Sequence, residues 1–253
     1  MAARGVLPPG YWIDFARPGE RLKYKHLLGG RNNWRGAYCL TCMRPLLLLL
    51  TLDPADPRLG VNRSPWKGKL NSVLIEKKNG EHDVKLVEPK LTALPLFYCW
   101  SCLPQLRYRL NFRGGIDVLD HDPSDSKESY SPAENQPEHF PPRKMKLVPL
   151  LKEEQALLRK HNRSELPEEV EREKRARPIF YPRHQVGGEP FLVQKNPDHQ
   201  GGSCEVCGAA KPLFVSLGDD SGMKGGFVNN AYVQLLFTYC QTCQILDVHN
   251  ECD

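Results

Sequence analysis

The sequence lacks any apolar segment long enough to span a bilayer. Its longest apolar run, PLLLLLTL at residues 45–52, is far shorter than the roughly 20 residues that a membrane helix needs. Residues 1–20 likewise contain no apolar core of the kind found in a secretory signal peptide. We therefore expect a cytoplasmic protein without membrane contact, in a compartment where thiols stay reduced.

The sequence also lacks a strong charge bias and the common catalytic motifs. A net charge of +5 over 253 residues is small for a nucleic-acid-binding protein, which usually presents a clustered basic face. H-E-x-x-H, G-x-S-x-G, the phosphate-binding G-x-x-x-x-G-K-[ST] and the zinc-deaminase signature are all missing. The histidines are scattered singly, so no nucleophile and base can be paired. We therefore expect a globular protein that is not an enzyme.

Cysteine, by contrast, is abundant and regularly spaced. Eight of the nine cysteines form four C-x-x-C pairs, two in each half of the chain. Two such turns can surround one zinc ion with four thiolates, as in a zinc ribbon. We therefore predict two structural Zn²⁺ ions and no other cofactor. The predicted ligands are Cys39, Cys42, Cys99 and Cys102 for one ion, and Cys204, Cys207, Cys240 and Cys243 for the other.

Other uses of C-x-x-C remain open. Disulfides are disfavoured by a reducing compartment, and a redox C-x-x-C would open a helix after a strand in a βαβ unit. An iron–sulfur cluster could take four thiolates, but the spacing matches no common cluster motif. The zinc pairing could also cross between the two halves. Cys252, close to His249, is interpreted as a spare thiol, with a substitute metal ligand as the alternative.

The two halves of the chain repeat one order of features. In each half, H-x-[LV]-G-G precedes a C-x-x-C pair, an apolar run containing aspartate, and an apolar run that ends in Tyr-Cys. The apolar runs occupy 44–53 and 94–99 in the first half, and 211–220 and 235–240 in the second. Their Leu, Val, Phe and Tyr content predicts strands. We therefore expect an α+β, β-rich fold with two related, duplicated zinc-knuckle modules.

Four further residues of the repeat are expected to support the fold. Tyr98 and Tyr239 directly precede cysteines, so they should pack beside the metal turns. His26 and His184 begin the H-x-[LV]-G-G motifs, and we expect each to hydrogen-bond a neighbouring loop rather than bind metal.

A charged, partly helical linker is predicted between the modules. Residues 114–142 contain seven acidic residues and five prolines but only one lysine, which predicts a loop. Helices are predicted over 148–161 and 164–178, with Ser164 capping the second. The second helix is expected to carry three i,i+4 ion pairs: Glu168–Arg172, Glu171–Arg175 and Glu173–Arg177. The predicted regions are an N-terminal zinc module with a hairpin insertion (1–112), the linker with two helices (113–180) and a C-terminal zinc module (181–253).

The hairpin insertion carries the best basic and aromatic patch in the chain. Asn79-Gly80 separates two strand-like runs within 72–87, which predicts a type I′ hairpin. The patch consists of Trp66, Lys67, Lys69, Lys77, Lys78 and Lys85. A solvated hairpin face is the simpler interpretation, and nucleic-acid contact is the alternative.

Parts of both halves resemble known families. RHQVGGEPFLVQ, CEVC followed by PLFVSLGDD, and VQLLFTYCQTC, all within 183–253, resemble the YwqG-like bacterial family of unknown function. The order L-G-G, cysteine pair, PLLLLLTLD and PLFYCWSC, within 26–102, is similar to the programmed-cell-death-protein-2 family. This second resemblance implies a β-rich body that acts as a dedicated chaperone for a ribosomal protein.

The sequence favours a zinc-stabilised scaffold that binds another protein, in a chaperone-like or immunity-like role. A four-cysteine site has no open coordination position, so its zinc is structural. A zinc-ribbon nucleic-acid-binding protein is the alternative function. The sequence does not indicate an oligomeric state.

Overall fold

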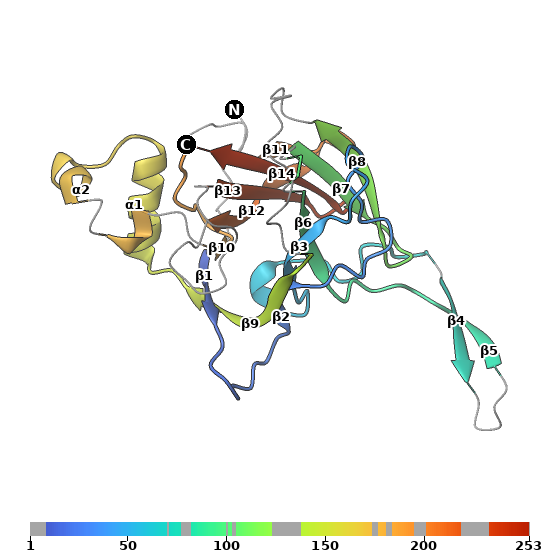
Figure 1. Cartoon of the computed structure of the whole chain (residues 1–253). Helices are drawn as coiled ribbons and strands as arrows, with labels where there is room; N and C mark the ends of the chain where they lie inside the picture. Colours follow the sequence, from blue (N-terminus) through green and yellow to red (C-terminus); the bar gives the residue numbers. More distant parts are fainter. Residues whose placement is uncertain are drawn as a thin grey trace.

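The computed structural model describes residues 9–69, 71–76, 82–99, 101–102, 105–122, 138–173, 177–180, 184–194, 201–218 and 233–252. Strands dominate this part of the chain, and its α-helices are short (Figure 1). The β-rich fold predicted from the sequence is therefore confirmed.

Four strands coincide with the predicted apolar runs. They are β3 (Leu47–Leu52), β6 (Leu94–Tyr98), β12 (Ala210–Gly218) and β13 (Val233–Cys240). All five residues of β6 are buried, on both faces of the strand. Because a strand buried on both faces gains from apolar residues at every position, these runs are continuous rather than alternating.

The main sheet contains twelve strands, and all its neighbouring strands pair antiparallel. Its order is β6-β3-β2-β9-β1-β10-β12-β13-β14-β7-β8, with β11 paired to β12. The sheet curls so that its strands surround a common core (Figure 1). The other strands are β1 (Tyr11–Phe15), β2 (His26–Gly30), β7 (Gln105–Leu110), β8 (Ile116–Asp122), β9 (Phe140–Pro149), β10 (Gln185–Val186), β11 (Gly201–Ser203) and β14 (Ile245–Cys252).

Strands from the two halves of the chain are interleaved. β1 comes first in the sequence, yet it lies between β9 and β10. β9 leads into the second half, yet it pairs with β2 of the first half. β7, which follows the second cysteine pair, pairs with β14 near the end of the chain. One sheet therefore contains strands from all three regions predicted from the sequence.

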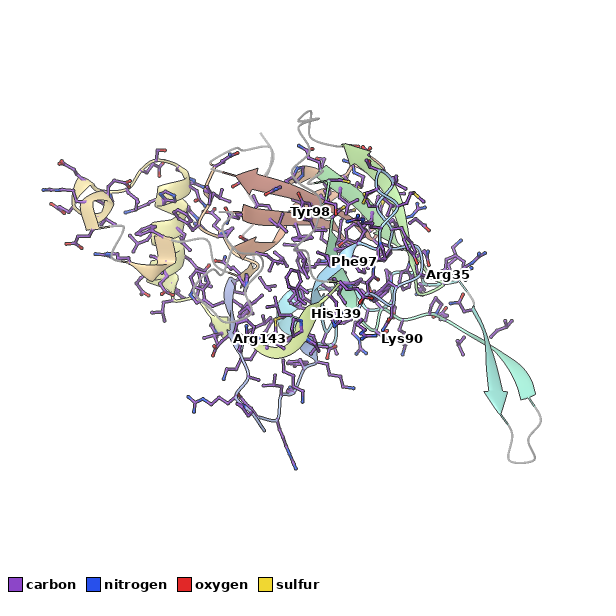
Figure 2. The ribbon with its side chains drawn as sticks, viewed as in Figure 1. Arg35, Lys90, Phe97, Tyr98, His139 and Arg143 are labelled. Carbon is purple, nitrogen blue, oxygen red and sulfur yellow. The ribbon has the colours of Figure 1, made fainter. Side chains whose placement is uncertain are left out.

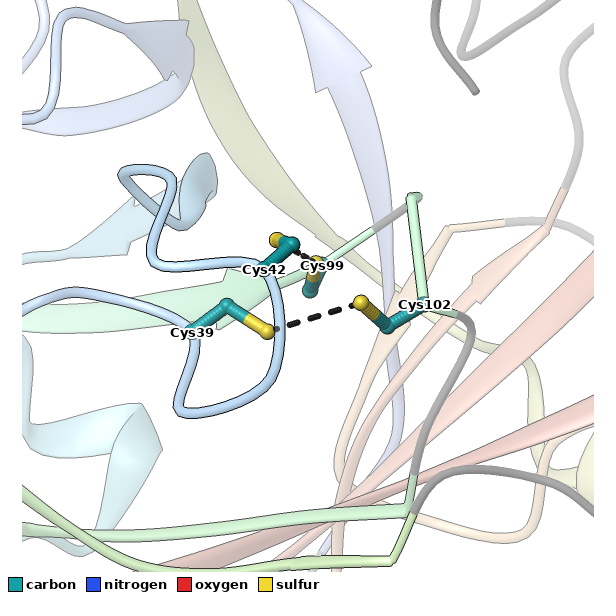
Figure 3. Close-up of side chains that lie close together, drawn as sticks. All are labelled: Cys39, Cys42, Cys99 and Cys102. Carbon is teal, nitrogen blue, oxygen red and sulfur yellow. Dashed lines mark hydrogen bonds between the residues drawn. The ribbon is translucent and has the colours of Figure 1, made fainter. Parts of the chain in front are cut away.

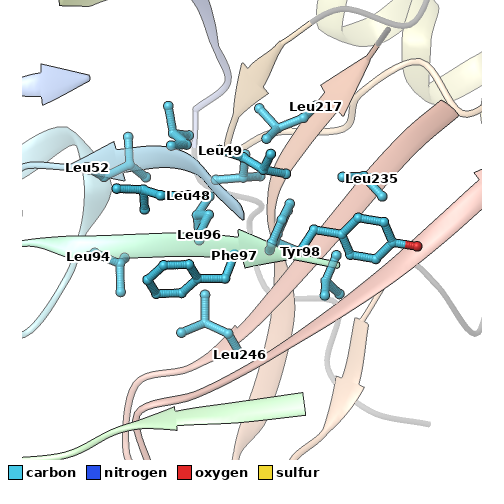
Figure 4. Close-up of a cluster of buried hydrophobic side chains, with 14 of the residues drawn as sticks. Leu48, Leu49, Leu52, Leu94, Leu96, Phe97, Tyr98, Leu217, Leu235 and Leu246 are labelled. Carbon is cyan, nitrogen blue, oxygen red and sulfur yellow. The ribbon is translucent and has the colours of Figure 1, made fainter. Parts of the chain in front are cut away.

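A tyrosine helps to join β7 to β6 where the sheet curls. The hydroxyl of Tyr108 on β7 accepts a hydrogen bond from Phe97 N–H (3.1 Å) and donates one to the Pro95 carbonyl (3.1 Å). Figure 4 shows leucines of β3 and β6 beside Leu217 of β12 and Leu246 of β14. The apolar runs of both halves therefore share one core.

The predicted linker loop over 114–142 is wrong at both of its ends. β8 occupies Ile116–Asp122, and β9 begins at Phe140. β8 gains its hydrogen bonds from β7, and Ile116 within it is buried. Pairing with strands distant in sequence therefore overrides the acidic, proline-rich composition that predicted a loop. The middle of the segment, 123–137, lies outside the described residues.

The first predicted helix is shorter than expected. The helix α1 spans Lys152–Asn162, because Val148 and Pro149 still belong to β9. Its buried face includes Leu158 and packs in a second, smaller core. That core also contains Trp12, Leu150, Ile179 and Phe180, the last two from the 3₁₀ turn η3 (Pro178–Phe180).

The second predicted helix is reduced to α2, Glu168–Glu173. Ser164 has a φ of 58° and lies in the turn after α1, so it does not cap α2 and that prediction is wrong. The predicted ion pair of Glu168 and Arg172 is present at 3.9 Å, and so is that of Glu173 and Arg177 at 2.9 Å. The remaining pair predicted on this helix involves residue 175, which is outside the described residues.

The hairpin insertion forms a separate two-stranded sheet. β4 (Asn71–Glu76) pairs antiparallel with β5 (His82–Val87), and the hairpin stands away from the main sheet (Figure 1). The predicted Asn-Gly turn itself lies outside the described residues. A single 3₁₀ turn, η1 (Pro57–Leu59), is described between β3 and β4. Among the described helices, none combines the length and hydrophobicity needed to cross a bilayer.

Candidate metal centres

The structure gathers eight cysteines into two groups of four. Within each group, the four sulfur atoms all lie within 4.8 Å of one another. None of the eight forms a disulfide in the structure, so the disulfide alternative is not supported for them. The first centre consists of Cys39, Cys42, Cys99 and Cys102, and the second centre of Cys204, Cys207, Cys240 and Cys243. These are the two sets that the sequence predicts, each drawn from one half of the chain.

The sulfur separations suit a tetrahedral metal ion. Cys39 Sγ lies 3.7 Å from Cys102 Sγ, and Cys42 Sγ lies 3.7 Å from Cys99 Sγ (Figure 3). In the second centre, Cys207 Sγ lies 3.6 Å from Cys240 Sγ. Four sulfurs at the usual Zn–S distance of about 2.3 Å, in a tetrahedron, are separated by about 3.8 Å. Both centres could therefore hold such an ion with little movement of the sulfurs.

Each described C-x-x-C turn is closed by a residue with positive φ. Met43 follows the first pair with a φ of 56°, Gly208 the third with 70°, and Gln244 the fourth with 58°. The chain then turns back, so that Cys39 N–H donates to Arg44 O (2.9 Å) and Cys204 N–H to Ala209 O (2.8 Å). Sequence reasoning named none of the three: glycine signals such a turn in a sequence, but methionine and glutamine do not.

Neighbouring groups in the first centre favour one thiolate. The pKa of Cys39 is lowered to about 4, because the Cys99 thiol and the amide groups of Cys42 and Thr41 point at its sulfur. The same contact with Cys39 raises the pKa of Cys99, and burial adds to the rise. Burial also raises the pKa of Cys102 to about 12. Metal binding at this centre must therefore displace protons from the thiols around Cys39.

The second centre has the same pattern with a weaker bias. Burial raises the pKa of Cys204, but the amide groups of Cys207 and Val206 and the neighbouring thiols outweigh it and lower the pKa to about 7. Burial raises the pKa of Cys240, and it raises that of Cys243 to about 12. Near neutral pH, Cys204 in this centre is therefore less completely ionised than Cys39 in the first centre.

An ion-pair network ties the second centre to the sheet. Arg107 on β7 contacts Glu205, inside the CEVC turn, at 2.5 Å, and Asp247 on β14 at 2.8 Å. Lys211 on β12 also contacts Asp247. Burial raises the pKa of Asp247, but the two cations outweigh it and the pKa is lowered. Sequence reasoning missed this network, because Arg107 and Asp247 meet only through the register of β7 and β14.

Tyr239 supports the last metal turn. Its hydroxyl donates to Gln244 Oε1 at 2.8 Å, and Gln244 in turn donates to the Gln241 carbonyl within the CQTC turn. Gln241 Oε1 also accepts from Asn62 N–H at 3.1 Å, which joins this turn to the first half of the chain. The prediction that Tyr239 packs beside a metal turn is confirmed. Tyr98 is likewise buried in the strand that leads to Cys99.

No histidine in the described part of the chain joins either centre. His26 Nε2 lies 2.9 Å from Asp56 Oδ2, and Asp53 N–H donates to His26 Nδ1 at 3.1 Å. The expected loop contact is therefore present for His26. His184 is buried, and its carbonyl accepts from Ile13 N–H at 3.0 Å. The side chain of Cys252 is outside the description, so its predicted role as a spare thiol stays a prediction.

The predicted basic and aromatic patch is only partly described. Trp66 is half-buried and packs against the main core, which leaves less of its ring for stacking. Lys67 and Lys69 are exposed beside it. The side chains of Lys77, Lys78 and Lys85 lie outside the description.

Comparison with known proteins adds no identification. No protein-family model, curated protein sequence or solved structure matches this chain.

Proposed function

We propose that this chain is a zinc-stabilised scaffold that binds another protein. The observation that carries the proposal is the pair of four-cysteine centres. With four thiolates around one Zn²⁺ no coordination position stays open for substrate or water, so the metal serves the fold. Structural zinc of this kind contributes on the order of 10 kcal/mol to folding. Zinc would therefore keep the C-x-x-C turns next to the strands of the sheet rigid.

A reducing compartment such as the cytoplasm fits the proposal, because none of the eight cysteines of the two centres forms a disulfide. Iron would need the same thiolates, but two centres of spaced C-x-x-C turns are more typical of zinc.

We further propose that the two halves derive from one module. The supporting observation is the strand order: β9-β2-β3-β6 on one side of the sheet and β1-β10-β12-β13 on the other. In the first series the second strand, β2, is the H-x-[LV]-G-G motif, and in the second series the second strand, β10, lies within that motif. The last strand of each series, β6 or β13, leads into a C-x-x-C turn. A relationship to the YwqG-like and programmed-cell-death-protein-2 families, with a chaperone-like or immunity-like role, belongs to the same proposal.

The test combines metal analysis with affinity capture from the native host. Purified protein should contain two equivalents of zinc. The captured partner should be a protein, and nuclease treatment should not reduce the amount captured. Iron in place of zinc would contradict the metal assignment. Capture of nuclease-sensitive RNA or DNA alone would contradict protein binding and favour the nucleic-acid alternative.

A further inference from the structure

The connection between β1 and β2 crosses over β9. Both strands pair with β9 at Met145, Phe15 on one side and His26 on the other. The connecting residues 16–25 must therefore pass over one face of β9. Lys146 Nζ holds them there by donating to the two carboxylate oxygens of Glu20, at 2.9 and 3.3 Å.

A cavity of about 270 Å³ lies between this connection and β9. Its charged lining consists of Arg17 and Glu20 from the connection, and Arg143 and Lys144 from β9. Phe15 forms an apolar part of the wall. The volume is slightly below that of pockets that enclose a whole drug-sized ligand, so it suits one or two side chains of a longer partner.

Arg143 is held in a defined position in this wall (Figure 2). Its guanidinium carbon lies 3.3 Å from the centroid of the Phe15 ring, a stacked cation–π arrangement. Its Nη1 is buried and has no hydrogen-bond acceptor among the described residues. An unpaired buried donor is costly, and an anion bound to the guanidinium would offset that cost.

The other two cations of the cavity are also available. Within the described chain, no carboxylate oxygen lies within 4 Å of the charged nitrogens of Arg17, Arg143 or Lys144, whereas Lys146 is paired with Glu20 and Asp14. Arg17 and Lys144 are exposed. Three cations therefore line one cavity in which the single carboxylate of the lining, Glu20, is already paired with Lys146.

The surroundings concentrate positive charge. Segments 14–31 and 138–149 hold eight lysines and arginines and three carboxylates, a net charge of +5. This equals the formal net charge of the whole chain, so the remaining residues are neutral in sum. A patch of this sign steers and retains an acidic partner.

The aromatic rings near the cavity argue against nucleic acid as that partner. Phe15 is covered by Arg143, and Arg58 lies 5.5 Å from the ring centroids of both Tyr11 and Tyr24. Single-stranded nucleic acids bind through bases stacked on free aromatic faces, and these rings already carry a cation.

We propose that this cavity docks a carboxylate side chain from an acidic segment of a partner protein, with Arg143, Arg17 and Lys144 as its cationic contacts. The partner segment is rich in aspartate or glutamate, and one carboxylate enters beside Phe15. This inference rests on the proposed protein-binding function and names the chemistry of the partner.

The test uses the full, zinc-loaded chain and a fluorescein-labelled hexaglutamate peptide, measured by anisotropy in 150 mM salt. Wild-type protein should bind the peptide saturably. The double variant R17E/K144E should bind at least tenfold more weakly. Because both of its positions are exposed, this variant should melt at the wild-type temperature. Arg143→Gln should also lose at least fivefold in affinity, and Arg143→Lys should retain part of it.

The matched control is K67E/K69E, which makes the same change in net charge at the exposed lysines beside Trp66. Its affinity should stay within twofold of wild type. Absence of saturable peptide binding, or equal losses in the two double variants, would overturn the proposal. So would tighter binding of a labelled hexauridine oligonucleotide that R17E/K144E abolishes.

Failure of this inference can be told apart from failure of the proposed function. If wild type and R17E/K144E capture the same protein partner equally well, the scaffold function stands and the acidic docking site is wrong. If neither captures a protein and the hexaglutamate does not bind, both are wrong.

Discussion

The two cysteine centres share one chemistry but differ in their surroundings. The first centre belongs to the main core: Cys39 and Cys99 are buried within it, and Cys42 and Cys102 pack against it. The second centre belongs to a small separate cluster, which contains Cys204, Cys240 and Ile245. Its Cys207 is exposed, whereas the first centre has no exposed cysteine.

The difference shows that identical C-x-x-C pairs can serve different structural tasks. In the first centre a metal ion would support the packing of the whole sheet. In the second it would fasten a surface turn, which the Arg107–Glu205 pair also secures. Removal of one thiol from each centre should therefore have unequal effects.

Replacement of Cys99 by serine should have the largest effect. Cys99 is 4% exposed and directly follows the fully buried strand β6. Loss of the metal would leave unpaired polar groups in the main core, so we expect a loss of several kcal/mol and global destabilisation. Zinc analysis and thermal melting test this. Cys252→Ser, which removes a thiol outside both groups, is the control and should keep two zinc equivalents.

Replacement of Cys240 by serine should lower the zinc content by one equivalent with a smaller loss of stability. Cys240 is buried, but its cluster is small and lies apart from the main core. The second half should be destabilised while β3 and β6 stay protected from hydrogen exchange. Full zinc retention with unchanged melting would contradict the assignment of this ligand.

Acid should release the second metal ion before the first. The lowest thiol pKa is about 7 in the second centre, at Cys204, and about 4 in the first, at Cys39. Both pKa values lie below the ordinary thiol pKa, so in the metal-free protein these thiolates stabilise the fold at pH above the ordinary value, and that stabilisation is lost as the pH falls through about 7 in the second centre and about 4 in the first. Protons should therefore compete with Zn²⁺ for Cys204 at a higher pH than for Cys39.

A zinc indicator dye can follow this release during an acid titration. Wild-type protein should lose zinc in two steps, and Cys240→Ser should show only the step at lower pH. If Cys240→Ser kept the step at higher pH instead, the order of the two centres would be reversed.

Arg107→Gln should have a moderate effect that is confined to the second centre. The substitution removes the cation that joins Glu205 to Asp247 and leaves Lys211 as the contact of Asp247. Groups that orient a metal site from outside typically change its affinity by about 10- to 100-fold. We expect an effect at the lower limit, because Glu205 is 67% exposed.

Competition with a chelator measures this affinity. Arg109→Gln is the matched control, since Arg109 lies on the same strand and pairs with Asp117 across exposed surface at 3.3 Å. If both variants lost zinc equally, the network around Arg107 would have no specific role.

Local patterns predicted the strands and the cysteine groups well. A run such as 94–99 is apolar throughout because both faces of β6 are buried, and C-x-x-C spacing by itself brings two sulfurs to one side. Long-range pairing was not predictable in this way. β8 and β9 carry acidic residues and prolines typical of loops. They form strands because β8 pairs with β7, and β9 pairs with β1 and β2. The contact of Arg107 with Asp247 depends on the same kind of pairing.

Substitution of glycine at the positive-φ positions Met43 and Gln244 should have the smallest effect on stability. The effect should differ between the first centre, which Met43 follows, and the second, which Gln244 follows. Met43 and Gln244 both have a φ near 57°, at 56° and 58°, a conformation that costs a residue with a side chain about 1 kcal/mol. Met43 is 70% exposed, so Met43→Gly should relieve strain and raise stability by up to about 1 kcal/mol. Gln244→Gly relieves the same strain but loses two hydrogen bonds of the buried side chain, one from Tyr239 and one to the Gln241 carbonyl, each worth about 1 kcal/mol. The free energy of unfolding, measured with urea, should therefore fall by about 1 kcal/mol, and a gain equal to that of Met43→Gly would show that these hydrogen bonds do not stabilise the turn.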